Sequence, residues 1–233
     1  MNLANVHIIT IDQTEEYFKQ ALQTLKHLNL PVGTKISFGG QKGEFISKSD
    51  KDQLTQYSGW NLKNSGNAFW DRDMTIGEFG CVVSHMRTWS RCHHNYIYPI
   101  LILEQDFVPL FDLNWSVFDE IENYDWDIIL LGRQPLAKDT EVGLNYFVKP
   151  GYSYQAHAYI LSKSGLRKIQ ENIKTLMDNL IPTDEFLPAL FATHPRADID
   201  AMYPNKINAL ALRVDAVAQS DWEGTGRSRT APK

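Results

Sequence analysis

Residues 100–107 read ILILEQDF, and this stretch decides how the rest of the chain is interpreted. A short run of large apolar residues bounded by polar ones is typical of a fully buried strand. Glu104 and Asp106, separated by one residue, follow where that strand ends. Hard divalent cations such as Mg²⁺ and Mn²⁺ prefer oxygen ligands and often bind through one or two carboxylates plus substrate phosphates. Because ligands bind at the open end of an α/β sheet, the stretch indicates a metal–nucleotide site; the alternative is a solvated strand end with ordinary surface acids.

Bulk composition limits the class of protein. The chain has 233 residues, of which 43% are hydrophobic and 12% aromatic, which fits one large domain or two small ones with a real core. Its net charge of −5 gives no global basic surface, so we expect no nucleic-acid partner. Cys81 and Cys92 lie within one expected helix and match neither a disulfide framework nor a paired metal-ligand spacing.

The N-terminal segment and the apolar runs bear on localisation. Residues 1–12 lack a basic region followed by a long apolar core, so they do not read as a signal peptide. No apolar run approaches the roughly 18 residues that a membrane span needs. We therefore expect a soluble, cytoplasmic chain without a membrane span.

Strand and helix patterns alternate along the chain. Thr14 is expected to cap the first helix, and residues 39–71 read as a long excursion with few regular elements, a type of segment that is often functional. This order predicts one α/β domain over residues 1–222 with a partly parallel sheet, followed by a mobile tail at residues 223–233. The expected strands are residues 6–11, 34–38, 100–103, 127–131, 154–161 and 207–217, and the expected helices are residues 15–28, 75–94, 164–172 and 182–191.

The start of the helix at residues 75–94 carries several candidate site residues. Gly77 and Gly80 lower helix propensity, so close backbone packing or the approach of a ligand must explain them. Thr75 and Glu78 match a capping box, which is one interpretation of Glu78, and a functional role is the other. His85 has apolar neighbours and is interpreted either as a hydrogen-bonded structural histidine or as a ligand.

A second acidic pair lies in residues 182–187, which read PTDEFL. Asp184 and Glu185 would either favour the start of the next helix, where acids are stabilising, or take part in chemistry.

The sequence leaves the roles of three further residues undecided. Arg133 follows a buried run and could reach a diphosphate or pair with a surface acid. Tyr152 and Tyr154 would face the same side of a strand, where they could belong to the core or line a sugar pocket.

Five motifs in this order resemble glycosyltransferase family 25, most of all its collagen hydroxylysine galactosyltransferase branch, which includes stand-alone giant-virus members. The similarity covers residues 6–221, and bacterial lipooligosaccharide galactosyltransferases match less well near residues 182–195. The motifs are RDMTIGEFGCVVSHMRTW at residues 72–89, PILILEQDF at 99–107, WDIILLGRQ at 126–134, GYSYQAHAYILSKSGLRKI at 151–169 and PTDEFLPALFATHP at 182–195.

The resemblance implies a GT-A-like fold that binds a nucleotide sugar. It implies Mn²⁺ or another divalent cation, a UDP-galactose donor, and inverting transfer to hydroxylysine of a collagen-like polypeptide. The giant-virus members suggest a viral or host-cell context, and the oligomeric state, including a homo-oligomer, is left open. The family usually reads Glu-Asp-Asp where this chain has Gln105 in the middle. The missing carboxylate would weaken the metal site or mark reduced activity.

The resemblance also assigns roles to residues. Asp106 is the first choice as metal ligand, with Glu104 in support through ribose, water or metal. Asp221 lies where related chains place a late metal-binding residue. The side chain of Gln105 should point opposite to those of Glu104 and Asp106, because side chains alternate along a strand.

The remaining assignments concern the donor pocket and the base. Asp184 and Glu185 are the candidates for the base that takes the acceptor proton, and the sequence does not separate a base from a ligand of the sugar hydroxyls. The expected donor-pocket residues are Thr10, Ile11 and Asp12 at the end of the first strand, with Glu78, Ser84, His85, Glu104 and Arg133.

Three functions therefore remain to be distinguished. The first is a galactosyltransferase that acts on collagen-like chains. The second is a glycosyltransferase with another donor or a saccharide acceptor, as in lipooligosaccharide synthesis. The third is a donor-binding module with weak activity, which the substitution at Gln105 suggests.

Overall fold

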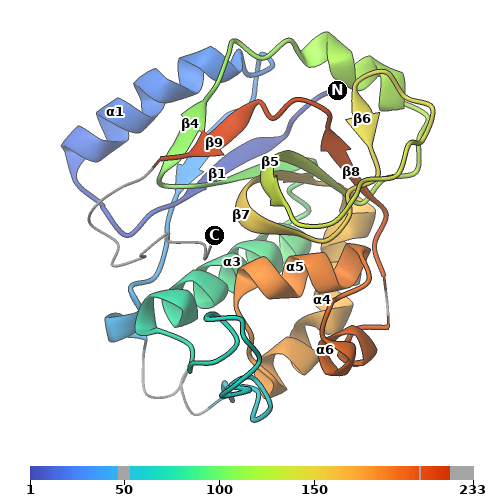
Figure 1. Cartoon of the computed structure of the whole chain (residues 1–233). Helices are drawn as coiled ribbons and strands as arrows, with labels where there is room; N and C mark the ends of the chain where they lie inside the picture. Colours follow the sequence, from blue (N-terminus) through green and yellow to red (C-terminus); the bar gives the residue numbers. More distant parts are fainter. Residues whose placement is uncertain (47–52, 205, 221–233) are drawn as a thin grey trace.

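The computed structural model describes residues 1–46, 53–204 and 206–220. A central mixed sheet has the strand order β2-β1-β3-β7-β5-β8-β6, with helices on both faces (Figure 1). The expected α/β fold with a partly parallel sheet is confirmed. Asp221 and the tail at residues 223–233 lie outside the described residues.

The elements have the following bounds. The strands are β1 (Asn5–Ile9), β2 (Lys35–Phe38), β3 (Ile100–Glu104), β4 (Phe107–Pro109), β5 (Ile128–Pro135), β6 (Phe147–Val148), β7 (Ser153–Leu161), β8 (Ala209–Leu212) and β9 (Val217–Gln219). The α-helices are α1 (Glu15–Leu25), α3 (Ile76–His94), α4 (Lys163–Asp178), α5 (Thr183–Phe191) and α6 (Ala197–Met202). Short 3₁₀ helices lie at Lys26–Leu28, Gly43–Phe45 and Trp115–Ile121.

Strand β3 occupies the middle of the fold, as its sequence predicts. It pairs in parallel with β1 and antiparallel with β7, and all five of its residues are buried. Ile100 and Ile102 pack in one apolar cluster with α3, α4 and α5, whereas Leu101 and Leu103 pack in a second cluster with α1 (Figure 1). Alternate side chains therefore enter cores on opposite faces, which explains the continuous apolar run.

Polar side chains fix the starts of the helices. The Thr14 side chain accepts a hydrogen bond from the Tyr17 amide at 3.2 Å and caps α1. Thr75 and Glu78 form the expected capping box of α3. A Cβ on Gly80 would lie 2.7 Å from the Gln41 carbonyl oxygen, so close backbone packing explains this glycine. No similarly close contact explains Gly77.

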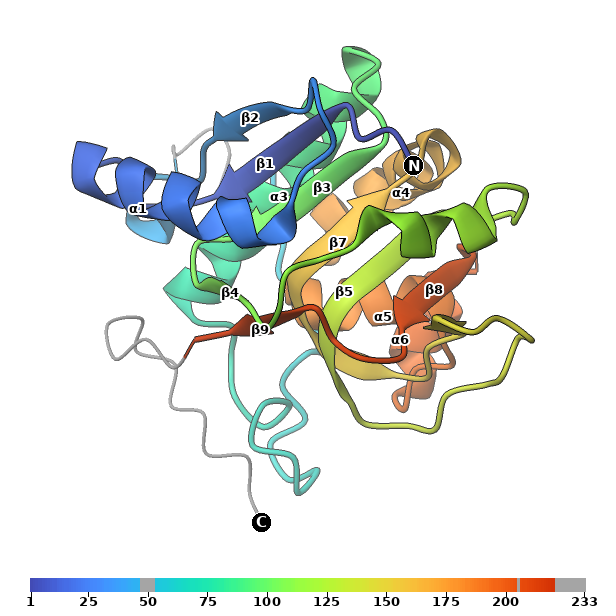
Figure 2. The ribbon, with the colours of Figure 1, turned by 90° about the horizontal axis from the view of Figure 1, so that it is seen from above.

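The last strand region differs from expectation. A last strand region was expected at residues 207–217, and here the chain forms β8, turns, and leaves the main sheet as β9. The Ala216 amide donates to the Leu131 carbonyl, and β9 then pairs with β4 in a separate two-stranded sheet (Figure 2). The region forms two short strands because a tertiary contact, rather than the local apolar pattern, bends the chain here. Strands β4 and β6 and helix α6, which are short, were not anticipated.

A membrane-spanning helix would need to be both long and apolar, and no helix within the described residues meets both conditions.

Candidate functional site

The carboxyl ends of β1 and β3 meet at one edge of the sheet. Ile9 pairs with Glu104 at the end of the parallel ladder, so the residues that follow both strands lie together. The side-chain oxygen of Gln105 accepts hydrogen bonds from the Thr10 hydroxyl at 3.1 Å and the Ile11 amide at 3.0 Å. Gln105 therefore fixes the segment after β1, where the donor nucleotide was expected.

Glu104 and Asp106 converge on the other side. The Nε2 of Gln219 donates to Oδ2 of Asp106 at 2.8 Å and to Oε2 of Glu104 at 3.3 Å. Strand β9 delivers Gln219 because it pairs with Phe107 of β4. These contacts, with those of Gln105 on Thr10, confirm that Gln105 points away from the two acids.

The chemistry of this carboxylate pair fits a small divalent cation. A single amide nitrogen reaches both carboxylates, so one positively charged centre could contact both as well. Two carboxylate oxygens are the hard ligands that Mg²⁺ and Mn²⁺ prefer.

A buried chain of hydrogen bonds through His85 and Tyr159 fixes the Glu104 carboxylate. The His85 imidazole contacts Oε1 of Glu104 through Nε2 at 3.1 Å and the Tyr159 hydroxyl through Nδ1 at 2.7 Å. The indole N–H of Trp89 donates to the same hydroxyl at 2.9 Å. Burial raises the pKa of Tyr159 well above its usual value, so the phenol stays protonated.

The direction of this chain follows from its donors. An indole N–H only donates, so the Tyr159 hydroxyl accepts from Trp89 and has its proton to give to Nδ1 of His85. When Nδ1 accepts this hydrogen bond, the imidazole carries its own proton on Nε2 and donates to the carboxylate of Glu104. Of the two interpretations of His85, the structure shows a hydrogen-bonded histidine, and its hydrogen bond orients a candidate ligand.

Cys81 lies between Glu104 and the start of helix α5. Its sulfur lies 3.4 Å from Oε1 of Glu104 and 3.6 Å from the Thr183 hydroxyl. Cys81, His85 and Glu104 place ligand atoms within 4.8 Å of one another, a mixed sulfur, nitrogen and oxygen set that suits Zn²⁺ more than Mn²⁺. Because Thr183 precedes Asp184, Cys81 brings the two acidic pairs into one region.

The other donor-pocket candidates support local structure. The Asp12 carboxylate accepts the Thr14 amide at 2.9 Å, and hydrogen bonds from Thr14 lower the pKa of Asp12. The Ser84 hydroxyl accepts the Gln41 amide at 2.8 Å and donates to the Gly80 carbonyl at 2.7 Å. The contacts of Asp12 with Thr14 and of Ser84 with Gln41 fix the segments that follow β1 and β2.

Glu78 and Arg133 both have ion-pair partners. Both oxygens of Glu78 accept from the Arg72 guanidinium at 2.7 Å. Burial acts to raise the pKa of Glu78, but hydrogen bonds from Arg72 and Thr75 outweigh it, and the pKa is lowered. Arg133 is buried and pairs with Asp139, which is one of its two expected partners; contact with a diphosphate stays a prediction.

Glu185 is enclosed by four hydrogen-bond donors. Oε1 accepts from the Trp70 indole at 2.7 Å and the Tyr154 hydroxyl at 2.9 Å. Oε2 accepts from the Tyr152 hydroxyl and from Nε2 of His194, the latter at 2.8 Å. The side chain is 3% exposed. Tyr152 and Tyr154 do face the same side, and both point at this carboxylate.

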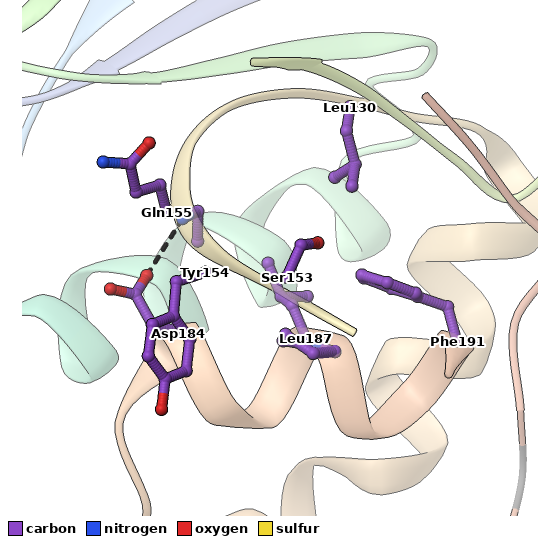
Figure 3. Close-up of a pocket in the computed structure, with 9 residues that line it drawn as sticks. Leu130, Ser153, Tyr154, Gln155, Asp184, Leu187 and Phe191 are labelled. Carbon is purple, nitrogen blue, oxygen red and sulfur yellow. Dashed lines mark hydrogen bonds between the residues drawn. The ribbon is translucent and has the colours of Figure 1, made fainter. Parts of the chain in front are cut away.

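Asp184 has a different environment although it is the neighbouring residue. It is half-buried, and its Oδ1 accepts the Ala156 amide at 2.9 Å. Figure 3 shows it at one end of a small pocket between β7 and α5, with Phe191 at the other end. Gln155, which also lines this pocket, has a φ of 74°, an uncommon value for a residue other than glycine. Such strain clusters at functional sites.

Sequence reasoning missed several residues of the site. Gln219 follows no motif, and only the pairing of β9 with β4 places it beside the acids. Trp70 lies in the long excursion at residues 39–71, and the sequence predicted no partner for it. Tyr159 and Trp89 were quoted within motifs, but neither was connected to Glu104. These residues are joined by contacts between distant segments, which local patterns do not reveal.

Fold and site together define an α/β protein with two converging carboxylates at the carboxyl ends of two parallel strands. A family model described as "Glycosyltransferase family 25 (LPS biosynthesis protein)" matches residues 5–113. With the relatives below, this match places the chain in glycosyltransferase family 25, as the sequence motifs suggested.

Three curated relatives illustrate the range of the family. A "Glycosyltransferase 25 family member" of Anopheles gambiae is 30% identical over 204 residues, covering 84% of this chain and 33% of the relative. A "Procollagen galactosyltransferase 1-B" of Xenopus laevis is 26% identical over 88% of this chain and 34% of its own. A "Probable inactive glycosyltransferase 25 family member 3" of Bos taurus is 31% identical over 66% and 27%, respectively. The chain spans about a third of the length of the first two and less of the third.

Proposed function

We propose that the chain is a metal-dependent glycosyltransferase that moves galactose from UDP-galactose to hydroxylysine of a collagen-like polypeptide, with inversion at the sugar. The observation that carries this proposal is the convergence of Glu104 and Asp106 beside the segment after β1. Membership of the family supports transfer of a sugar. The name of the Xenopus relative supports galactose and a procollagen acceptor.

On the donor side, Asp106 and Glu104 would hold a divalent cation, with Asp221 as a further candidate outside the described residues. A bound divalent ion would supply neutralisation of the charge that builds on the diphosphate leaving group. Thr10, Ile11 and Asp12 would hold the uridine, in a position fixed by the hydrogen bonds of Gln105. Gln219 would then have to release the carboxylates that it now bridges.

On the acceptor side, Asp184 is the base in this proposal. A base must reach the acceptor hydroxyl, and Asp184 is half-buried at the end of a pocket. Glu185 is 3% exposed, and each of its oxygens already accepts two hydrogen bonds. We therefore give Glu185 an anchoring role and Asp184 the catalytic one.

The test is calorimetric titration of UDP with and without Mn²⁺. We expect clearly tighter binding with Mn²⁺, and Asp106→Asn should remove most of that difference because it replaces an anionic ligand with a neutral one of the same shape. Asp178→Asn, at the exposed end of α4, is the matched control and should behave like the wild type. Equal UDP affinity in both conditions would refute the metal-dependent donor site.

A donor-binding module with little transfer is the second candidate. Gln105 and the relative named as inactive favour it. Donor hydrolysis or galactose transfer by purified protein distinguishes the two candidates.

The description of the family as lipopolysaccharide biosynthesis proteins favours a saccharide acceptor instead, and a panel of saccharides and hydroxylysine peptides decides between the acceptors.

A further inference from the structure

The excursion after β2 ends in a segment, residues 57–73, that is fixed to the rest of the molecule. The Trp70 indole donates to Glu185 at 2.7 Å, and Arg72 pairs with Glu78 at 2.7 Å. At the other end of the segment, the Arg196 guanidinium donates to the Trp60 carbonyl at 2.7 Å and lies 5.4 Å from the Trp60 ring. Two acids that the sequence suggested for chemistry, Glu78 and Glu185, are thus the anchors of one segment.

These anchors hold Phe69 in a defined position. Phe69 immediately precedes Trp70, and the Arg72 guanidinium lies 5.7 Å from the centre of its ring. The ring meets that of Tyr154 edge to face, with centroids 6.2 Å apart. Tyr154 is itself fixed, because its hydroxyl donates to Glu185. Despite these contacts Phe69 remains 36% exposed, so part of the ring is available to a ligand.

The location of this aromatic pair decides which ligand it meets. Tyr154 and Asp184 line the same pocket, and Asp184 is the base in the proposed reaction. A base contacts the acceptor rather than the nucleotide, and the exposed Phe69 ring packs on Tyr154, which lines the pocket that holds this base. The carbon chain around the reacting hydroxyl of hydroxylysine is apolar on its flank and carries an ammonium group, and aromatic rings attract both.

We infer that Phe69 and Tyr154 form the contact surface for the acceptor side chain, with Phe69 as a specificity-determining residue. This inference rests on the proposed function, because it takes the acceptor to be the ligand beside Asp184. It assigns the segment at residues 57–73 to the acceptor, whereas the segment after β1 serves the donor.

The experiment compares Phe69→Ala with Phe111→Ala, a matched control at a phenylalanine that is 44% exposed and belongs to neither acidic site. Galactose transfer to a collagen-like peptide with one hydroxylysine gives KM and kcat, and calorimetry gives the affinity for UDP with Mn²⁺. Phe69→Ala should raise KM for the peptide about tenfold and leave the affinity for UDP unchanged. Phe111→Ala should change neither quantity.

Two outcomes overturn the inference while leaving the proposed function intact. In the first, Phe69→Ala transfers galactose as the Phe111→Ala control does. In the second, the affinity for UDP falls by the same factor as the affinity for the peptide, which would place Phe69 on the donor. Because Phe69 is exposed, both variants should fold, and thermal melting checks this.

A direct binding measurement covers a chain that turns over too slowly to assay. The same peptide is titrated into each protein loaded with UDP and Mn²⁺, and only Phe69→Ala should weaken binding. A wild type that does not bind the peptide, or a Phe69→Ala variant that binds it equally well, overturns the inference. The metal dependence of UDP binding judges the proposed function separately.

Discussion

The two acidic pairs of this protein look alike in sequence and differ in structure. Glu104 ends β3, Asp106 follows it in the turn before β4, and the two carboxylates converge on one amide group. Asp184 and Glu185 are adjacent at the start of α5, and their carboxylates have separate environments. One lines a pocket, and the other is enclosed by four donors.

Backbone geometry explains the difference. Glu104 is the last residue of β3 and Asp106 lies in the two-residue turn before β4, and this tight turn brings their carboxylates to one amide of Gln219. Successive residues on a helix are turned by about 100°, so adjacent acids point in different directions. An acidic pair is therefore informative only together with the element that carries it.

The largest expected effect tests whether Asp184 alone is the base. Asp184→Asn should lower galactose transfer by a factor on the order of 10² to 10⁴, because the amide cannot take the acceptor proton. Its affinity for UDP and its free energy of unfolding should remain close to those of the wild type. Near-normal transfer by this variant would show that the half-buried acid only favours the helix start.

Loss of the Glu185 carboxylate should mainly lower the stability of the fold, unlike loss of the Asp184 carboxylate. Glu185→Leu leaves four donors without their acceptor, two of them on buried and two on half-buried side chains, and should lower the free energy of unfolding by at least about 3 kcal/mol. Urea unfolding measures this, with Glu185→Gln as the conservative variant and Asp184→Asn as the control. If Glu185→Leu unfolds at the same urea concentration as the control, the anchoring role is wrong.

The strand that leads to the expected donor site can be tested through the pH dependence of stability. His7 lies on this strand, β1, three residues before Thr10. Burial, with the nearby charge of Arg91, lowers the pKa of His7 from 6.5 to about 4. Between pH 6.5 and 4 the unfolded chain binds this proton and the folded chain does not, so the free energy of unfolding should fall as the pH is lowered. Below pH 4 the full loss in the free energy of unfolding that is due to His7 is about 3 kcal/mol.

The measurement is urea unfolding of the wild type and of His7→Gln across this pH range. The variant should lose less stability than the wild type as the pH falls, and above pH 6.5 the two curves should run parallel. Identical curves throughout would mean that His7 accepts its proton in the folded state as readily as in the unfolded state.

The smallest expected effect concerns Gln105. Its side chain contacts Thr10 and Ile11 on the side opposite to Glu104 and Asp106, so Gln105→Asp should change the affinity for Mn²⁺ less than about threefold. Titration of Mn²⁺ in the presence of UDP gives this value. A gain from no transfer to full transfer on the same substitution would instead identify the natural chain as a degraded enzyme.

Local patterns predicted much of the fold. The continuous apolar run of β3, the Thr14 cap of α1 and the capping box at Thr75 each depend on residues close in the chain, and each was found. Strand β9 was not separated from β8, because its partner β4 is more than a hundred residues away. The resemblance to the family was also visible in short motifs, and the comparisons confirm it.

The sequence by itself determined that two acids follow a buried strand together, because the apolar run of β3 ends directly at Glu104. It also predicted that Gln105 points away from them, although in the structure a turn at residues 105–106, not strand alternation, sets this direction. Only the tertiary structure decided what surrounds each acid. Glu185 is enclosed because Trp70 and the pair Tyr152 and Tyr154 come from two distant segments and His194 comes from the segment after α5. The burial and hydrogen bonding of a carboxylate depend on side chains that such distant segments bring to it. The residue type and spacing of the two acids in the sequence therefore could not separate an anchor from a candidate base.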